Sequence, residues 1–301
     1  MSADNSEEDN TSSARCASCG VAENDDVKLK NCTACYLVRY CGVKCQRDHW
    51  SKHKKECKKR AAELRDEILF KQPESSCFGD CPLCCLPLPI DTQKSGFMSC
   101  CGKRICDGCN ISNQKREMEM RLQRSCPFCR TPVLKTEEEG IERLIKRVEV
   151  NDPVALRCLG TKRRLEGDYK RAFECWTKAT ELGDVESHYQ LACMYQHGHG
   201  VSMDEKKEVH HFEKAAIGGY PDARFNLGLI EEDYGRYERA VKHFIIAANL
   251  GCDRSLENLK HMYQKGKVSK EDFSAALRAY QVAVGATKSP QREEAEEYYS
   301  K

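Results

Sequence analysis

The sequence predicts a multidomain fold in which two small cysteine-rich modules precede an all-α solenoid of about four helix-pair repeats. Seventeen of the 21 cysteines lie before residue 130, most of them in Cys-x2-Cys pairs. Beyond residue 150 the composition changes to alanine, leucine and tyrosine at helical spacing. There the motifs "KATELGD", "KAAIGGY" and "IAANLGC" recur at intervals of 36 and then 32 residues, which indicates an internal repeat.

The overall composition is that of a soluble protein. Charged residues make up 32% of the 301 residues, and no apolar run approaches the about 20 residues needed to span a bilayer. Residues 1–14 are acidic and serine-rich, without the basic start and apolar stretch of a secretory signal, so we expect a disordered leader. We therefore expect an intracellular protein, in the cytoplasm or nucleus, whose paired thiols bind zinc. Disulfides are the less favoured alternative.

The first cysteine cluster offers eight ligands, enough for two tetrahedral zinc ions. They are Cys16, Cys19, Cys32, Cys35, Cys41, Cys45, His53 and Cys57. The segment "YCGVKCQRDHWSKHKKEC" strongly resembles the MYND zinc finger, whose ligand register is met throughout, and we place this finger at residues 15–57. Because so short a segment buries little surface, zinc must supply its folding free energy, about 10 to 16 kcal/mol per structural site.

The MYND resemblance implies how the ligands are shared and what the finger binds. Ligand pairs interleave in that family, which gives one ion to Cys16, Cys19, Cys41 and Cys45 and the other to Cys32, Cys35, His53 and Cys57. MYND fingers are interaction modules for short proline-containing peptides, and by motif the peptide-binding positions are Thr33, Gln46 and Trp50. The alternative for Trp50 is that it packs beneath the metal sites.

A basic stretch overlaps the last ligands of this finger. Eight basic residues between Lys44 and Arg60 face two acidic ones, which raises nucleic-acid binding as a weak hypothesis. We favour neutralisation of the anionic thiolate sites as the explanation. Residues 58–76 form a predicted helical linker that Pro73 ends.

The second cluster lies in residues 77–133, and its register resembles a RING finger. Lys103 stands where an ordinary RING has a histidine, and a protonated lysine has no lone pair for zinc. An all-cysteine RING variant has the spacing of Cys101 to Cys106. We therefore assign one zinc to Cys81, Cys84, Cys106 and Cys109 and its partner to Cys100, Cys101, Cys126 and Cys129.

This assignment requires a sharp turn, because neighbouring side chains in an extended strand point to opposite faces. Gly102 would permit the turn, and Cys77 or Cys85 could substitute for one of the adjacent pair. Together the two fingers then bind four zinc ions per chain, with no open catalytic position.

The RING resemblance leaves two functions open. In RING ubiquitin ligases, three positions contact the charged conjugating enzyme, and the matching residues are Leu83, Pro127 and Arg130. Each could instead be structural, as core packing, a zinc-knuckle proline and a surface charge. The segment "NISNQKREMEMRLQRS" also lacks the aromatic residue that often helps to grip that enzyme. The module is thus either a ubiquitin ligase or a scaffold without catalysis.

A charged linker at residues 134–152 leads to the repeats, which resemble Sel-1-like repeats, relatives of tetratricopeptide repeats, over residues 153–285. Equivalent core positions are Leu159, Leu191, Leu227 and Leu259, followed by Trp176, Phe212, Phe244 and Tyr280. Glycines 183, 219 and 251 end helices. Single cysteines and the histidines of "QHGHGV" are expected to be structural. Residues 286–301 form a frayed helix or tail.

These elements predict a modular adaptor. The MYND finger and the solenoid recruit protein partners, and the RING-like module brings a ubiquitin-conjugating enzyme to them. A pure interaction scaffold is the alternative, and a nuclear regulator that binds nucleic acid is a weaker one.

Overall fold

The computed structural model describes residues 14–133 and 136–300, so the expected leader at residues 1–14 lies outside the described residues except for Ala14. The chain divides into two compact units, Met1–Leu69 and Phe70–Lys301. In the described part of the chain, no helix combines the length and apolar character needed to cross a membrane.

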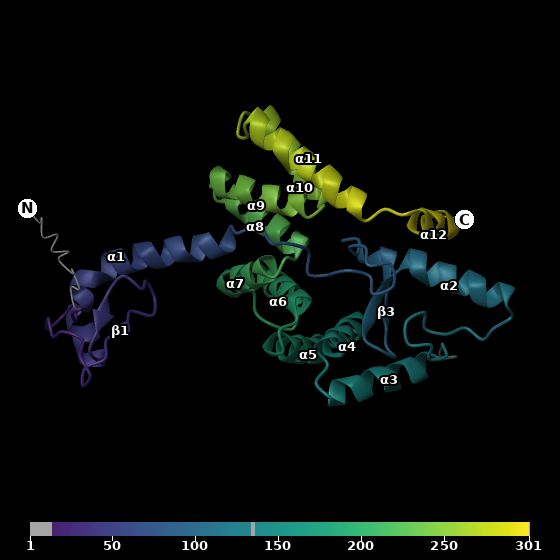
Figure 1. Cartoon of the computed structure of the whole chain (residues 1–301), viewed down its shortest axis with the longest axis horizontal. Coiled ribbons are helices and arrows are strands. Elements are labelled where there is room, and N and C mark those ends of the chain that lie inside the picture. Colours follow the sequence, from purple (N-terminus) through teal and green to yellow (C-terminus); the bar gives the residue numbers. More distant parts are fainter. Residues whose placement is uncertain (1–13, 134–135, 301) are drawn as a thin grey trace, which may run out of the picture. The chain divides into compact units, whose positions relative to one another are not determined.

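The elements follow one another as short strands and then helices (Figure 1). The first unit contains β1 (Lys30–Asn31), β2 (Arg39–Tyr40) and α1 (Val43–Leu69). The second begins with a 3-10 turn η1 (Thr92–Lys94), β3 (Ser95–Met98), β4 (Lys103–Cys106), α2 (Asp107–Glu119) and α3 (Glu137–Glu149). It continues with α4 (Pro153–Leu165), α5 (Tyr169–Glu181), α6 (Val185–His197), α7 (Glu205–Ile217), α8 (Pro221–Asp233), α9 (Tyr237–Asn249), α10 (Asp253–Gln264), α11 (Lys270–Ala286) and α12 (Pro290–Tyr299).

The first unit has a core made largely of cysteines. Its buried residues are Cys16, Cys32, Cys35, Tyr40 and Cys57, with Leu29 and Val38 packed against them. Strands β1 and β2 form a two-residue antiparallel pair, and α1 runs unbroken for 27 residues through the last ligand positions and most of the expected linker. So small an apolar core cannot hold the unit together alone, which agrees with a metal-dependent fold.

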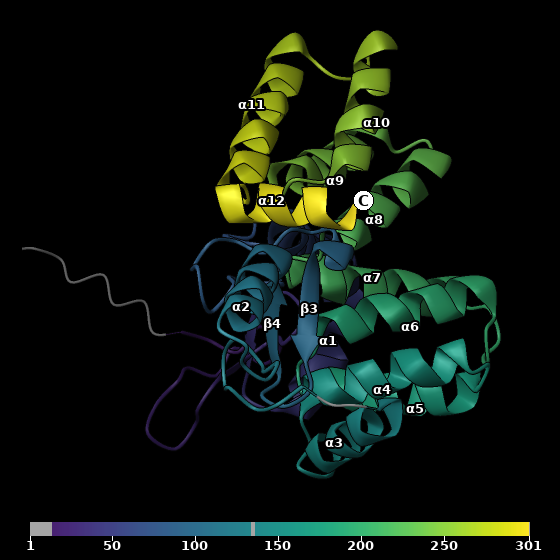
Figure 2. The same ribbon diagram turned by 90° about the vertical axis from the view of Figure 1, so that its right-hand side faces the viewer.

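The second unit is built on antiparallel helix pairs from α4 to α11, which stack side by side (Figure 2). Aspartate side chains accept hydrogen bonds from backbone N–H groups in the first turns of four successive helices, and these N-caps are Asp152, Asp168, Asp184 and Asp204. Each cap typically stabilises its helix by about 1 kcal/mol. The expected glycines at 183, 219 and 251 have φ near +87°, +84° and +95°, a conformation that favours glycine where a helix ends.

The core positions expected from the repeat are buried within the array. Trp176, Phe212 and Phe244 are fully enclosed, whereas Leu159 in the first repeat and Tyr280 in the last are partly exposed. The last repeat has a neighbouring repeat on one side only, which explains the exposure of Tyr280. Glycine is required where aromatic rings meet a facing helix, because a Cβ added to Gly228 would lie 2.5 Å from Cε1 of Phe244.

Two segments outside the predicted modules, the charged linker and the frayed helix or tail, contain well-formed helices. The charged linker contains α3, which Thr136 caps and which buries Leu144 against α4. The expected tail contains α12, which Ser289 caps and which packs along α2. Both helices are polar, so their ordering depends on contacts with elements distant in sequence.

Candidate metal centres

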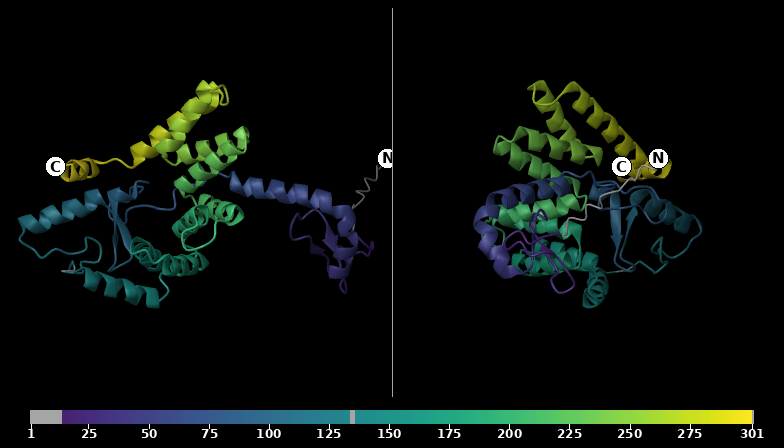
Figure 3. Two further views of the ribbon diagram at one scale, coloured as in Figure 1. Left: turned by 180° about the vertical axis from the view of Figure 1, so that it is seen from behind. Right: turned by 60° about the vertical axis from the view of Figure 1, so that its left-hand side comes forward.

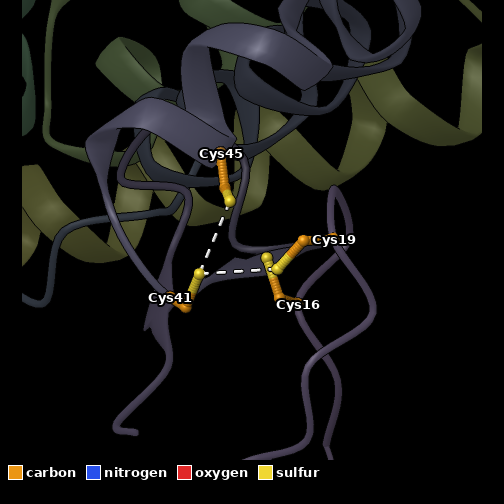
Figure 4. Close-up of side chains that lie close together, drawn as sticks. All are labelled: Cys16, Cys19, Cys41 and Cys45. Carbon is orange, nitrogen blue, oxygen red and sulfur yellow. Dashed lines mark hydrogen bonds between the residues drawn. The ribbon is translucent and has the colours of Figure 1, made fainter.

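The first candidate centre brings together the side chains of Cys16, Cys19, Cys41 and Cys45 (Figure 4). Their sulfur atoms all lie within 4.8 Å of one another, with Cys19 3.7 Å from Cys41 and Cys41 3.5 Å from Cys45. Four thiolates at a Zn–S distance of about 2.3 Å around a tetrahedral ion are about 3.8 Å apart. The arrangement therefore fits zinc.

The second centre of this finger is fully buried and consists of Cys32, Cys35, His53 and Cys57. The sulfur atoms of Cys32 and Cys57 are 3.7 Å apart, and Nε2 of His53 lies 3.2 Å from the sulfur of Cys35. The two ligand sets interleave along the chain as the resemblance implied. The first set joins the start of the segment to the beginning of α1, and the second joins the middle of the segment to the following turns of α1.

The second unit contains two more clusters of the same kind. One joins Cys81, Cys84, Cys106 and Cys109, and the other joins Cys100, Cys101, Cys126 and Cys129. Sulfur separations are 3.8 Å between Cys84 and Cys106, 3.9 Å between Cys101 and Cys126, and 3.4 Å between Cys100 and Cys129. These sets also interleave, which gives the module a cross-braced arrangement.

Four Cys-x2-Cys pairs form turns of one design. In each, the backbone N–H four residues after the first cysteine donates to that cysteine's carbonyl, over 2.9 Å in every case. The donating residue has positive φ each time: Gly20 at 74°, Tyr36 at 59°, Cys85 at 55° and Arg130 at 61°. The turn points both sulfur atoms to one side, so local backbone geometry prepares each pair for a shared ion.

Backbone donors in these turns also favour the thiolate form. Burial raises the pKa of Cys16, but backbone N–H groups of Cys19, Cys41 and Ser18 outweigh it and bring the pKa to about 6. A thiolate is the form that binds zinc.

The adjacent Cys100 and Cys101 reach one cluster because the chain turns between β3 and β4. Backbone N–H groups of Cys101 and Gly102 both donate to the carbonyl of Met98, and Gly102 has φ near +70°, which confirms the expected turn. Lys103 lies outside the cluster with its ammonium 5.9 Å from the centroid of the Phe128 ring. Among the described residues, neither Cys77 nor Cys85 belongs to a four-ligand cluster.

The positions expected to bind a peptide are accessible on the first unit. Thr33 is exposed and Gln46 is half-buried. Trp50 is 42% exposed, and its ring meets His53 edge-on at a centroid distance of 6.5 Å. Trp50 thus packs against the metal centre with one edge while much of the indole faces outward.

The three positions expected to contact a conjugating enzyme differ in accessibility. Leu83 is 40% exposed, whereas Pro127 is buried. Arg130 is exposed, and its guanidinium donates to Oδ1 of Asn113 on α2 over 2.7 Å. Pro127 therefore supports the turn between two ligands rather than offering a surface.

Sequence reasoning missed the contacts that hold the second zinc module, residues 77–133, against the helical repeats. Arg104 of β4 donates to both carboxylate oxygens of Glu186 at the start of α6, and Arg157 of α4 also bonds to Glu186 and to Asp184. Phe78 packs edge-on against Tyr220. These residues come from five separated segments, so no local pattern could have revealed them.

The cysteine clusters and the stacked helix pairs define the class as zinc-finger proteins that carry helical repeats, and known protein families match both parts of the chain. The MYND finger family model matches residues 16–57, and the Sel1 repeat model matches residues 158–184, 185–220 and 221–252. The chain contains a MYND finger and Sel1 repeats and binds zinc at four candidate sites. The RING resemblance of residues 77–133 has no counterpart in these matches.

Individual relatives share parts of the chain. "DAP3-binding cell death enhancer 1" of Mus musculus is 23% identical over 196 residues, which cover 52% of this chain and 38% of that protein. "Chitin synthase regulatory factor 2" of Schizosaccharomyces pombe is 30% identical over 121 residues, covering 36% of this chain and 23% of that protein. A Sel1 repeat protein from Oxalobacter formigenes has a TM-score of 0.42 at 26% identity, covering 50% of this chain and 64% of its own. The chain thus spans well under half the length of these curated relatives.

Proposed function

We propose that the MYND finger binds a short proline-containing peptide of a partner protein at Thr33, Gln46 and Trp50, while the second unit engages other proteins. The exposure of Trp50 carries this proposal. A large aromatic side chain fixed at one edge by a metal-held helix, with its face accessible, offers apolar area at little entropic cost. Proline-rich segments suit such a surface because their extended conformation is already restricted.

The test is binding of a fluorescent proline-containing peptide to the zinc-loaded protein. Trp50→Ala should weaken binding at least about tenfold, as loss of an aromatic anchor does, without releasing zinc. Ile68→Ala is the matched control, since Ile68 is an exposed apolar residue on the same helix, about 27 Å away along its axis. Unchanged peptide affinity in Trp50→Ala would refute the assignment, and zinc loss would assign Trp50 a structural role.

We further propose that the sixteen clustered side chains are the zinc ligands and that the second module recruits a ubiquitin-conjugating enzyme. The cross-braced pairs, the exposed Leu83 between the first two cysteines and Arg130 directly after the last one support this proposal. A RING-type module has no covalent intermediate of its own and acts by holding the charged enzyme in a reactive arrangement. The bond to Asn113 uses one terminal nitrogen of the Arg130 guanidinium, so the other N–H groups remain available to ubiquitin.

Discharge of ubiquitin from a panel of charged conjugating enzymes tests the transfer function. Leu83→Ala should weaken enzyme binding, and Arg130→Ala should mainly slow discharge, with four zinc ions retained in both. Arg124→Ala, at another exposed arginine of the same module, is the control for charge alone. If the wild-type protein discharges no enzyme in the panel, the module is an interaction scaffold.

A further inference from the structure

The C-terminal helix α12 makes an unusually close contact with the second zinc module. It runs beside α2, which lies almost 200 residues earlier in the chain (Figures 2 and 3). A Cβ added to Gly108 of α2 would lie 2.8 Å from the backbone nitrogen of Arg292 and 2.9 Å from the carbonyl carbon of Gln291. Ala295, one turn further along α12, is fully buried. The two helices therefore touch at the backbone, which only glycine at position 108 allows.

Arg292 enters the module from this contact and is only 6% exposed. One terminal nitrogen of its guanidinium donates to the carbonyls of Pro87 and Thr287, each over 2.7 Å. The other donates to the carbonyl of Leu86 over 3.2 Å and to the sulfur of Cys84 over 3.4 Å. Arginine is rarely so buried unless its charge is compensated.

The compensation comes from the cluster that Arg292 faces. A zinc ion with four thiolates carries a net charge of about −2, so a guanidinium beside one of its sulfur atoms lowers the free energy of the loaded site. The three carbonyls fix the orientation of the Arg292 guanidinium, so that one of its N–H groups points at the sulfur of Cys84. Groups that hydrogen-bond to metal ligands commonly change metal affinity by about 10- to 100-fold.

We propose that Arg292 is a positioning residue of the zinc site formed by Cys81, Cys84, Cys106 and Cys109, and that α12 is thereby part of the second zinc module. This inference rests on the proposed ligand assignment. Because the coupling is reciprocal, zinc binding stabilises the docked helix as much as the docked helix stabilises zinc binding. The segment expected to be a frayed helix or tail thus completes a metal centre.

The test is zinc affinity of the full-length protein, measured by competition with a chromogenic chelator. Arg292→Gln should lower the affinity of one zinc equivalent by about tenfold or more and leave the other three unchanged. Arg292→Lys keeps the charge but not the fork, so it should restore part of the affinity. Glu297→Gln, at an exposed position on the same helix, is the control. Equal affinities in wild type and Arg292→Gln would overturn the proposal.

A second readout separates this role from simple helix packing. Removal of zinc from the wild-type protein should raise amide hydrogen exchange across residues 290–299, because the anionic partner of Arg292 is lost. Unchanged exchange in the metal-free protein would contradict the inference. So would faster exchange of α12 in Arg292→Gln without a loss of zinc affinity, because Arg292 would then only hold the helix in place. Cys84→Ser tests the assignment beneath it, since retention of four zinc ions in that variant would refute the ligand set itself.

Discussion

Replacement of His243 by phenylalanine should make the second unit more stable, and increasingly so as the pH falls. His243 lies on α9 with its ring fully buried, 4.7 Å between centroids from that of Phe70. Neither ring nitrogen has a hydrogen-bond partner among the described residues. Burial, with the nearby charges of Arg224 and Arg239, lowers the pKa of His243 from 6.5 to about 3.

The sign of the pH dependence follows from this depressed pKa. Above pH 6.5 the ring is neutral in both the folded and the unfolded chain, so the full stability is present. As the pH falls from 6.5 towards 3, His243 binds a proton in the unfolded chain but stays neutral in the folded chain, so the free energy of unfolding decreases. Between about pH 8 and about pH 5.5 the loss from this one residue is about 1.4 kcal/mol.

Urea unfolding followed by far-ultraviolet circular dichroism would measure this effect. The free energy of unfolding of His243→Phe should exceed that of the wild type, and the excess should grow by about 1.4 kcal/mol over that pH interval. His188 and His211, whose pKa burial lowers to about 4, act in the same direction but are common to both proteins and cancel in the difference. His261→Phe, at an exposed position on α10, controls for loss of an imidazole. Parallel pH profiles for wild type and His243→Phe would refute the reasoning.

Three further predictions address the zinc modules and the repeats. Cys101→Ser should release about one of four zinc equivalents by elemental analysis, whereas Lys103→Ala should release none; zinc loss only in the lysine variant would reverse the assignment. Cys85→Gly should retain all four zinc ions and gain about 1 kcal/mol in stability, because position 85 has φ near +55°; a lost zinc equivalent would instead make Cys85 a ligand. Gly228→Ala should lower the free energy of unfolding by about 1 to 3 kcal/mol, since its Cβ would collide with the Phe244 ring, and a neutral effect would show that the helices can separate there.

The sequence by itself determined the parts of this protein whose cause is local. Cysteine spacing predicted the Cys-x2-Cys turns, because a turn that aims two sulfur atoms at one point needs only a few consecutive residues. The interleaving of these pairs was implied by the resemblance to MYND and RING fingers. The helical repeat could also be predicted from the sequence, since Trp176, Phe212 and Phe244 recur at one position of a unit that packs mainly against its neighbours. Even the turn that brings the adjacent Cys100 and Cys101 together could be predicted, because Gly102 directly follows them.

Tertiary structure alone decided how the second module is held. The bonds of Arg104 and Arg157 to Glu186, and the approach of Arg292 to Cys84, join side chains that lie tens to hundreds of residues apart. Polar helices such as α12 have little tendency to form in isolation, so their sequence looks like that of a tail. Helix α12 becomes ordered because the buried charge of Arg292 lies beside the cysteine cluster and Gly108 leaves room for its backbone, and neither the cluster nor Gly108 belongs to the helix itself.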